Sequence, residues 1–180
     1  MAEALEDKTF GSKFGALWSA KVGLAQRRLQ DQLGRPLEDR EWEPMNRAWA
    51  DIANHFTAVD YGLALSAVAQ YRRAVQSWWH DGWDLLLTPT LGELPLKLGT
   101  IVNDPDDPMS PTRRSGDFAP FTAPFNTSGQ PAISLQLEWT AEGLPVGVQL
   151  VAAYGREDIL IRIASQLEQA KPWAPRTPEV

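Results

Sequence analysis

The chain has 180 residues and a formal net charge of -6, with 17 Lys and Arg against 23 Asp and Glu. This charge argues against a nucleic-acid surface, which needs clustered positive charge. The lack of cysteine excludes disulfides, thiolate metal ligands and a cysteine nucleophile, and the two histidines limit metal chemistry further. We therefore expect no metal site, no cofactor and no nucleic-acid partner.

Length and hydropathy limit the classes of protein to which the chain can belong. The 180 residues suit a single domain over residues 1–180, because a chain of this size buries about 70% of the surface that its unfolded form exposes. No apolar run approaches the length of a membrane span, and the acidic start of the chain differs from a signal peptide. We therefore expect no membrane partner and a cytoplasmic location. The eight tryptophans suggest packing junctions or contact with another chain.

The first part of the domain, residues 1–82, is predicted to be helical. Apolar residues recur at steps of three and four over residues 14–33, and a second apolar stripe covers residues 45–56. Gly34 is expected to end the first of these helices, and Pro44 is suited to the first turn of the second.

A third helix is predicted to follow directly. Thr57 and Asp60 resemble a capping box, in which two residues three positions apart satisfy the free backbone donors of a helix start. Gly82 is expected to close this helix. Its predicted apolar face comprises Tyr61, Leu65, Val68, Arg72, Val75 and Trp79.

The second part, residues 83–180, is predicted to hold the strands. The continuous apolar run at residues 85–87 favours a strand buried on both faces. Residues 91–117 are rich in proline, glycine and aspartate and lack periodicity, which is typical of a long irregular loop that is functional or mobile.

A hairpin and a closing helix complete this part. Residues 126–131 are turn formers in which Gly129 is expected to take a positive φ, so a strand should begin directly afterwards. Residues 132–138 and 146–150 alternate apolar and polar positions, which predicts two antiparallel strands. Residues 159–167 predict a last helix. The fold class is therefore α/β, a mixed sheet covered by helices, with a helical N-terminal segment.

Several residues carry groups that can perform chemistry. Ser128 precedes a predicted turn, where its hydroxyl either acts as a nucleophile or stabilises the turn. His55 and His80 lie in the last turns of predicted helices, where the helix dipole favours a cation, so we favour a structural role over acid–base catalysis. Asp104, Asp106 and Asp107 suggest a calcium-binding loop, but the glycine and the terminal glutamate that such a loop needs are missing. We therefore favour solvated loop charges for these three residues.

Four segments of the second part form a recognisable pattern. They are DLLLTPT at residues 84–90, PFN and GQPAIS within residues 124–134, GLPVGVQL at residues 143–150, and GRED at residues 155–158. Their order and spacing resemble the C-terminal part of the amidase signature family, including its bacterial members. The resemblance covers most of the chain and implies the C-terminal part of the amidase signature fold. It also implies hydrolysis of a small-molecule carboxylic amide by a Ser, Ser and Lys triad.

The catalytic residues of that family belong to an earlier region rich in glycine and serine. There, one serine attacks the amide carbonyl, a second relays the proton to a lysine, and backbone N–H groups form the oxyanion hole. This chain has no Gly-Gly-Ser-Ser-type run, and its lysines lie in polar or terminal settings. We therefore assign no catalytic residue to it.

The resemblance does suggest substrate contacts. Thr90 and Asn126 match family segments that lie close to the substrate cleft, so each is expected to contact the substrate, with backbone hydrogen bonding as the alternative role. Ala119 stands about where members acting on glutamine-like amides carry an acidic residue. Its presence implies apolar or neutral amides, and argues against a subunit of a glutamine-dependent tRNA amidotransferase.

Three functions remain open. The chain is the C-terminal portion of an amidase whose catalytic residues lie elsewhere. Alternatively, it is a non-catalytic module that docks on a separate N-terminal amidase chain, or self-associates, and completes its sheet and substrate cleft. As a third possibility, it is a relic without activity, which predicts exposed apolar surface around residues 85–87.

Overall fold

The computed structural model describes residues 10–173, so the acidic start of the chain lies outside the described residues. The chain divides into two compact units. Within the described residues, the helical unit comprises residues 10–71 and 99–115, and the sheet unit comprises residues 72–98 and 116–173. The single domain expected from the length stays a prediction, because a compact unit is not by itself an independently folding domain.

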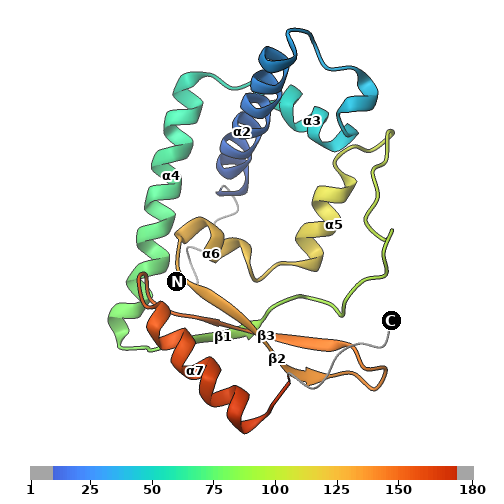
Figure 1. Ribbon diagram of the computed structural model, residues 1–180. Coiled ribbons are helices and arrows are strands. Elements are labelled where there is room, and N and C mark those ends of the chain that lie inside the picture. The colour runs from blue at the N-terminus through green and yellow to red at the C-terminus, as the bar shows by residue number, and fades with distance from the viewer. Residues whose placement is uncertain (1–9, 174–180) are drawn as a thin grey trace. The chain divides into compact units, whose positions relative to one another are not determined.

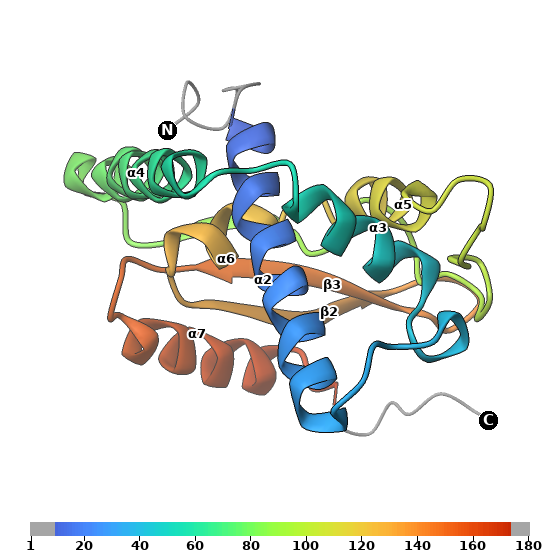
Figure 2. The same ribbon diagram turned by 90° about the horizontal axis from the view of Figure 1, so that it is seen from above.

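The first two predicted helices are confirmed as α2 (Phe10–Leu33) and α3 (Pro44–Ala53), which pack against each other in the helical unit (Figure 2). Gly34 follows α2 with φ 66°, and Pro44 opens the first turn of α3. A Cβ placed on Gly23 would lie 3.1 Å from the Cβ of Ala53. A glycine on α2 therefore permits the close approach of α3.

An ion pair organises the connection between α2 and α3, which contains the short 3₁₀ helix η1 (Asp39–Glu41). Both terminal nitrogens of Arg35 donate to the Glu41 carboxylate at 2.8 Å, and the backbone N–H of Glu38 donates to it at 2.9 Å. These bonds, that of Arg35 foremost, lower the pKa of Glu41 to about 2. The carboxylate therefore stays charged at neutral pH and holds the turn between the two helices.

The third predicted helix is confirmed as α4 (Ala58–Ser77), followed by the 3₁₀ turn η2 (Trp78–Asp81). Its capping box is present: the Asp60 carboxylate accepts a bond from the Thr57 N–H at 2.8 Å, and the Thr57 hydroxyl accepts one from the Asp60 N–H at 3.2 Å. Gly82 ends η2 with φ 87°, as expected.

The predicted apolar face of α4 is wrong in part. Tyr61 and Leu65 are exposed, Leu65 to 50%, whereas Ala64 is buried. Ala64 packs with Ala16 and Leu17 of α2 in a small core. Small side chains fill this contact between helices. A prediction from hydrophobic periodicity gives more weight to large apolar residues, so it selects the neighbouring face of α4 instead.

The sheet unit contains a three-stranded antiparallel sheet (Figure 1), in the order β1 (Leu86–Pro89), β3 (Pro145–Val151), β2 (Ala132–Trp139). The predicted hairpin is confirmed, since β2 and β3 pair with Leu135 opposite Val148. This sheet and the surrounding helices confirm the expected α/β class.

The expectation that residues 85–87 form a strand buried on both faces is wrong. β1 is an edge strand, and Leu87 is 66% exposed. The strand buried on both faces is β3, whose last residues Gln149, Leu150 and Val151 are all buried. A central strand has neighbours on both sides, and an edge strand has one, so burial follows position in the sheet more than local hydropathy.

One face of the sheet packs on the final helix, α7 (Glu157–Ala170), which confirms the predicted closing helix (Figure 1). Leu135 and Leu150 from the strands and Leu160 from α7 form the buried core of this unit. Partly buried apolar residues surround that core: Leu85, Ile133, Leu137, Ile163, Ala164, Leu167 and Trp173.

Two further helices interrupt regions predicted to be irregular. α5 (Ser110–Phe118) occupies the end of the predicted loop at residues 91–117, and α6 (Ala123–Ser128) includes residues predicted as a turn. Pro124 lies in the first turn of α6, where a proline costs no hydrogen bond, and Gly129 ends it with φ 76°. The positive φ of Gly129 is thereby confirmed, but as a helix cap.

Among residues 10–173, no helix is both long enough and apolar enough to cross a membrane.

The end of α6 provides a test of this local structure. Gly129→Val places a β-branched residue at φ 76°, with the added Cβ 3.5 Å from the Arg72 guanidinium, so we expect a loss of about 3 kcal/mol in the free energy of unfolding. Ser128→Ala removes one hydroxyl hydrogen bond and should cost about 1 kcal/mol. Urea unfolding of both variants measures the difference. Equal stabilities would contradict the assignment of Gly129 as a left-handed cap.

Candidate functional site

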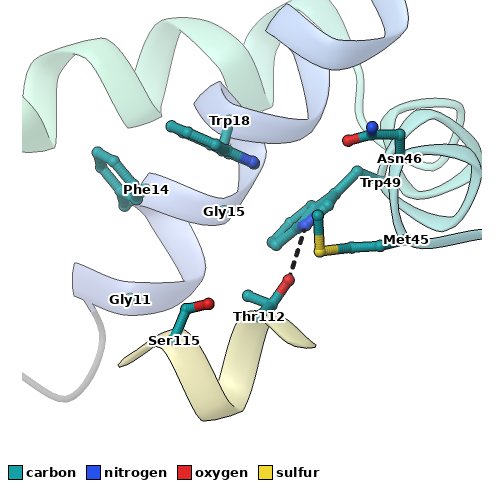
Figure 3. A pocket seen from close by; sticks show the side chains of 9 residues that line it. All are labelled: Gly11, Phe14, Gly15, Trp18, Met45, Asn46, Trp49, Thr112 and Ser115. Atoms are coloured by element: carbon teal, nitrogen blue, oxygen red, sulfur yellow. Dashed lines mark hydrogen bonds between the residues drawn. The ribbon is translucent and has the colours of Figure 1, made fainter. Parts of the chain in front are cut away.

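An apolar pocket of about 380 Å³ lies in the helical unit, between α2, α3 and the first turns of α5 (Figure 3). We call it the α2–α3–α5 pocket. Its lining comprises Gly11, Phe14, Gly15, Trp18, Met45, Asn46, Trp49, Thr112 and Ser115. Its size falls in the range of small-molecule sites, which are mostly apolar with a few placed polar groups.

Aromatic rings form two walls of this pocket. Phe14 and Trp18, one turn apart on α2, stack with their ring centroids 6.2 Å apart and their planes at 29°. The indole of Trp49 on α3 closes the opposite side, and its Nε1–H donates to the Thr112 hydroxyl at 3.2 Å (Figure 3). This bond satisfies the indole donor and fixes the ring, so Trp49 presents an apolar face to the cavity.

Two polar side chains of the lining keep free hydrogen-bonding groups. Within residues 10–173, nothing bonds to the Asn46 amide of α3 or to the Ser115 hydroxyl of α5. No lining residue is ionisable. The pocket therefore offers neutral donors and acceptors beside an apolar surface.

The sheet unit carries a row of polar side chains on the face opposite its core. Thr88, Gln149 and Ser134 are directly paired across β1, β3 and β2 and so share one face. Gln149 is 5% exposed, and its Nε2 donates to the Thr88 hydroxyl at 3.0 Å and to the carbonyl of Phe121 at 3.1 Å. This amide joins two strands to the chain segment that leads into α6.

Thr90 extends this row just after the end of β1, the position predicted from the sequence. Its N–H donates to the carbonyl of Gly147 at 3.1 Å, and its hydroxyl lies 2.7 Å from that of Ser134. The two hydroxyls meet above Gly147, where an added Cβ would lie 2.8 Å from the Ser134 oxygen and 2.9 Å from the Thr90 oxygen. The glycine of β3 therefore creates the room for this hydroxyl pair.

Asn126 lies in α6 with an exposed side chain, rather than at the end of a turn. The hydrogen bonds of the described residues do not join it to Thr90, and the role of both residues as substrate contacts stays a prediction. Sequence reasoning missed Ser134 and Gln149. Ser134 alternates with apolar neighbours, a pattern that gives no sign of a partner for its hydroxyl, and the burial of Gln149 has no local signal.

The other candidate residues make local contacts or lie exposed in this geometry. Ser128 is fully buried, and its hydroxyl donates to the Gln130 side chain at 2.8 Å, which favours the structural interpretation over a nucleophile. His55 is exposed, with Nδ1 3.1 Å from the Asp51 carbonyl of its own helix. His80 is likewise exposed on η2.

The acidic loop shows local bonds instead of a ligand cage. The carboxylate of Asp104 accepts a bond from the Asp106 N–H at 2.9 Å, and Asp107 pairs with Arg113. Across residues 10–173, no three acidic or histidine side chains group in a way that holds a metal ion.

The chain is similar to known proteins. A profile of the amidase family matches residues 7–161. The chain is 37% identical, over 99% of its length, to 6-aminohexanoate-cyclic-dimer hydrolase of Paenarthrobacter ureafaciens, of which it covers 37%. It is also 42% identical to the putative amidase AmiC of Mycobacterium tuberculosis, over 51% of this chain and 19% of that protein.

Solved structures show the same similarity. A structure of 6-aminohexanoate cyclic dimer hydrolase complexed with substrate superposes with a TM-score of 0.90 at 35% identity, over 98% of this chain and 38% of that one. A crystal structure titled as an amidase shares the fold at 21% identity, with a TM-score of 0.70, over 93% of this chain and 36% of that one.

The chain thus spans less than two fifths of the length of the hydrolase that it matches from end to end. The predicted resemblance of the four sequence segments to amidases is thereby confirmed. The chain belongs to the amidase family, the amidase signature enzymes.

Proposed function

We propose that this chain is the C-terminal part of an amidase that hydrolyses the C–N bond of a carboxylic amide. The observation that carries the proposal is the 37% identity to a hydrolase over 99% of the chain. A fold match alone would not suffice, since one fold hosts many functions. Here the match includes sequence along the whole chain.

The proposed chemistry is that of the family. One serine attacks the amide carbonyl, a second serine relays its proton to a lysine, and the amine leaves with that proton before water releases the acid. We propose that a segment outside this chain supplies these three residues. In support, the hydroxyl of Ser128 is buried, and Lys171 is exposed and paired with Glu138 at 2.6 Å.

The proposed substrate is a neutral or apolar amide. Ala119 offers no charge to hold a substrate ammonium group, and the hydrolase relative is named for a cyclic dimer of 6-aminohexanoate. Thr90 and Asn126 are proposed to contact this substrate through their hydroxyl and amide groups. A cytoplasmic location and a single domain belong to the same proposal.

A second candidate is an interaction module without chemistry of its own. In the described part of the chain, β1 and β2 each have one strand neighbour, and Leu87 on β1 is 66% exposed. Open edges invite pairing with another strand. A separate N-terminal amidase chain, or a second copy of this chain, would then cover this surface, and copurification of such a partner would distinguish this function. An inactive relic would leave the same surface bare.

Reaction with a fluorophosphonate, which traps activated serines, tests the location of the catalytic residues. We expect intact-mass analysis of the folded chain to show no adduct, because the hydroxyl of Ser128 donates to a side-chain amide and that of Ser134 meets the Thr90 hydroxyl, and neither partner is a base. Ser128→Ala serves as the control. A stoichiometric adduct would contradict the proposal, and its loss in Ser128→Ala would identify the nucleophile.

Substitution of the two predicted contact residues tests substrate binding. We expect Thr90→Val and Asn126→Ala each to weaken binding of a neutral amide about 2- to 12-fold, the range for loss of one neutral hydrogen bond. Isothermal titration measures the affinity. Thr90→Ser should restore binding, and Thr127→Val on α6 should leave it unchanged. Unchanged affinity in both test variants would assign Thr90 and Asn126 to backbone structure instead.

A further inference from the structure

The α2–α3–α5 pocket has a neutral, aromatic lining that favours one class of ligand. We infer that it holds the ring or chain of an uncharged carboxamide, with the polar group of the ligand reaching Ser115 at one end of the pocket or Asn46 at the other (Figure 3). The inference rests on the proposed function and deepens it, because it names a part of the chain that binds a neutral amide.

The size of the pocket sets the size of the ligand. A dry cavity of about 150 Å³ lined by apolar side chains is enough to bind benzene. The pocket here measures about 380 Å³, so it accommodates a six-membered ring together with a polar group of several atoms. The part of the ligand that enters the pocket is therefore about the size of a substituted ring.

The charge of the lining sets the charge of the ligand. All nine lining residues are neutral, so a carboxylate or an ammonium group would lose its hydration there without a charged partner. A neutral amide avoids this loss and still forms a hydrogen bond with one of the two free polar side chains. The carboxamide of Asn46 can donate and accept, and the hydroxyl of Ser115 can do the same.

The aromatic walls supply the contact surface. Trp18 is 48% exposed although its ring stacks on Phe14, which leaves an apolar face for a ligand ring. The Trp49 donor is occupied by Thr112 at 3.2 Å, so a ligand covers this ring without having to pair its N–H. A ring placed between these walls gains aromatic contact on two sides.

Two glycines of α2 keep the cavity open. Gly11 and Gly15 lie one turn apart in the lining, and a Cβ placed on either meets no neighbouring heavy atom within 4 Å. A longer side chain at Gly15 therefore starts in open space beside the cavity. It would also raise the helix propensity of α2, so the variant should fold.

This freedom permits a test that separates binding from folding. We compare Gly15→Leu with Gly62→Leu, since Gly62 also lies in a helix with open space around its Cβ but is not part of the lining. The probes are benzamide and benzoate, which match in shape and differ in charge. The readout is the indole N–H signals of Trp18 and Trp49 in nitrogen-correlated NMR spectra, assigned with Trp→Phe variants.

We expect benzamide to shift both indole signals in a saturable way and benzoate to bind at least tenfold more weakly. Gly15→Leu should weaken benzamide binding at least tenfold, and Gly62→Leu should change it less than twofold. Equal benzamide affinity in the two leucine variants would overturn the inference, as would equal affinity for benzoate. Loss of benzamide binding when a complementary amidase chain is added would also overturn it, because the pocket would then be an interface.

This binding test is independent of hydrolysis. If benzamide binds as expected but the chain, joined by a complementary amidase segment, hydrolyses no amide, then the proposed function fails and the pocket stands. If amides are hydrolysed but Gly15→Leu binds benzamide as tightly as Gly62→Leu, then the pocket assignment fails and the proposed function stands.

Discussion

The sheet unit depends on the position of β3 between β1 and β2. A polar side chain in the centre of a sheet must find partners or lose the free energy of its hydration. Gln149 of β3 meets this demand by bonding to Thr88 of β1 and to the Phe121 carbonyl before α6. One buried amide therefore ties the strands to the segment before α6, and Gly129 ends α6 shortly before β2. Alternation along the strands places an apolar face against α7 and a row of polar side chains on the other face.

The helical unit depends on close helix contacts made by small residues. Ala16, Ala64 and Gly23 let α2 meet its neighbours at short distance, while the large aromatic residues of α2 lie elsewhere on its surface. Phe14 and Trp18 are consequently available to line a pocket instead of a core. The bond from Trp49 to Thr112 then ties α3 to α5 at one wall of that pocket.

The polar groups of the two units have different surroundings. The hydroxyl pair of Thr90 and Ser134 lies on a rigid sheet above Gly147, where positions are held within hydrogen-bonding distance. The Asn46 and Ser115 groups instead lie beside aromatic surface, where a neutral amide loses little on leaving water. Neither set contains a nucleophile paired with a base. This agrees with the proposal that a segment outside this chain, which spans 37% of its hydrolase relative, supplies the catalytic residues.

Local patterns in the sequence determined the elements and the family. The Thr57 capping box, the Gly34 and Gly82 helix ends and the alternation of β2 depend on bonds within a few residues, so the sequence predicts them correctly. Tertiary structure decided burial and the site. Which strand is central, which face of α4 is covered and which residues form the pocket all depend on segments distant in sequence, such as Trp49 and Thr112, 63 positions apart. Local hydropathy carries no information on such partners, because burial is decided by whatever packs against a residue.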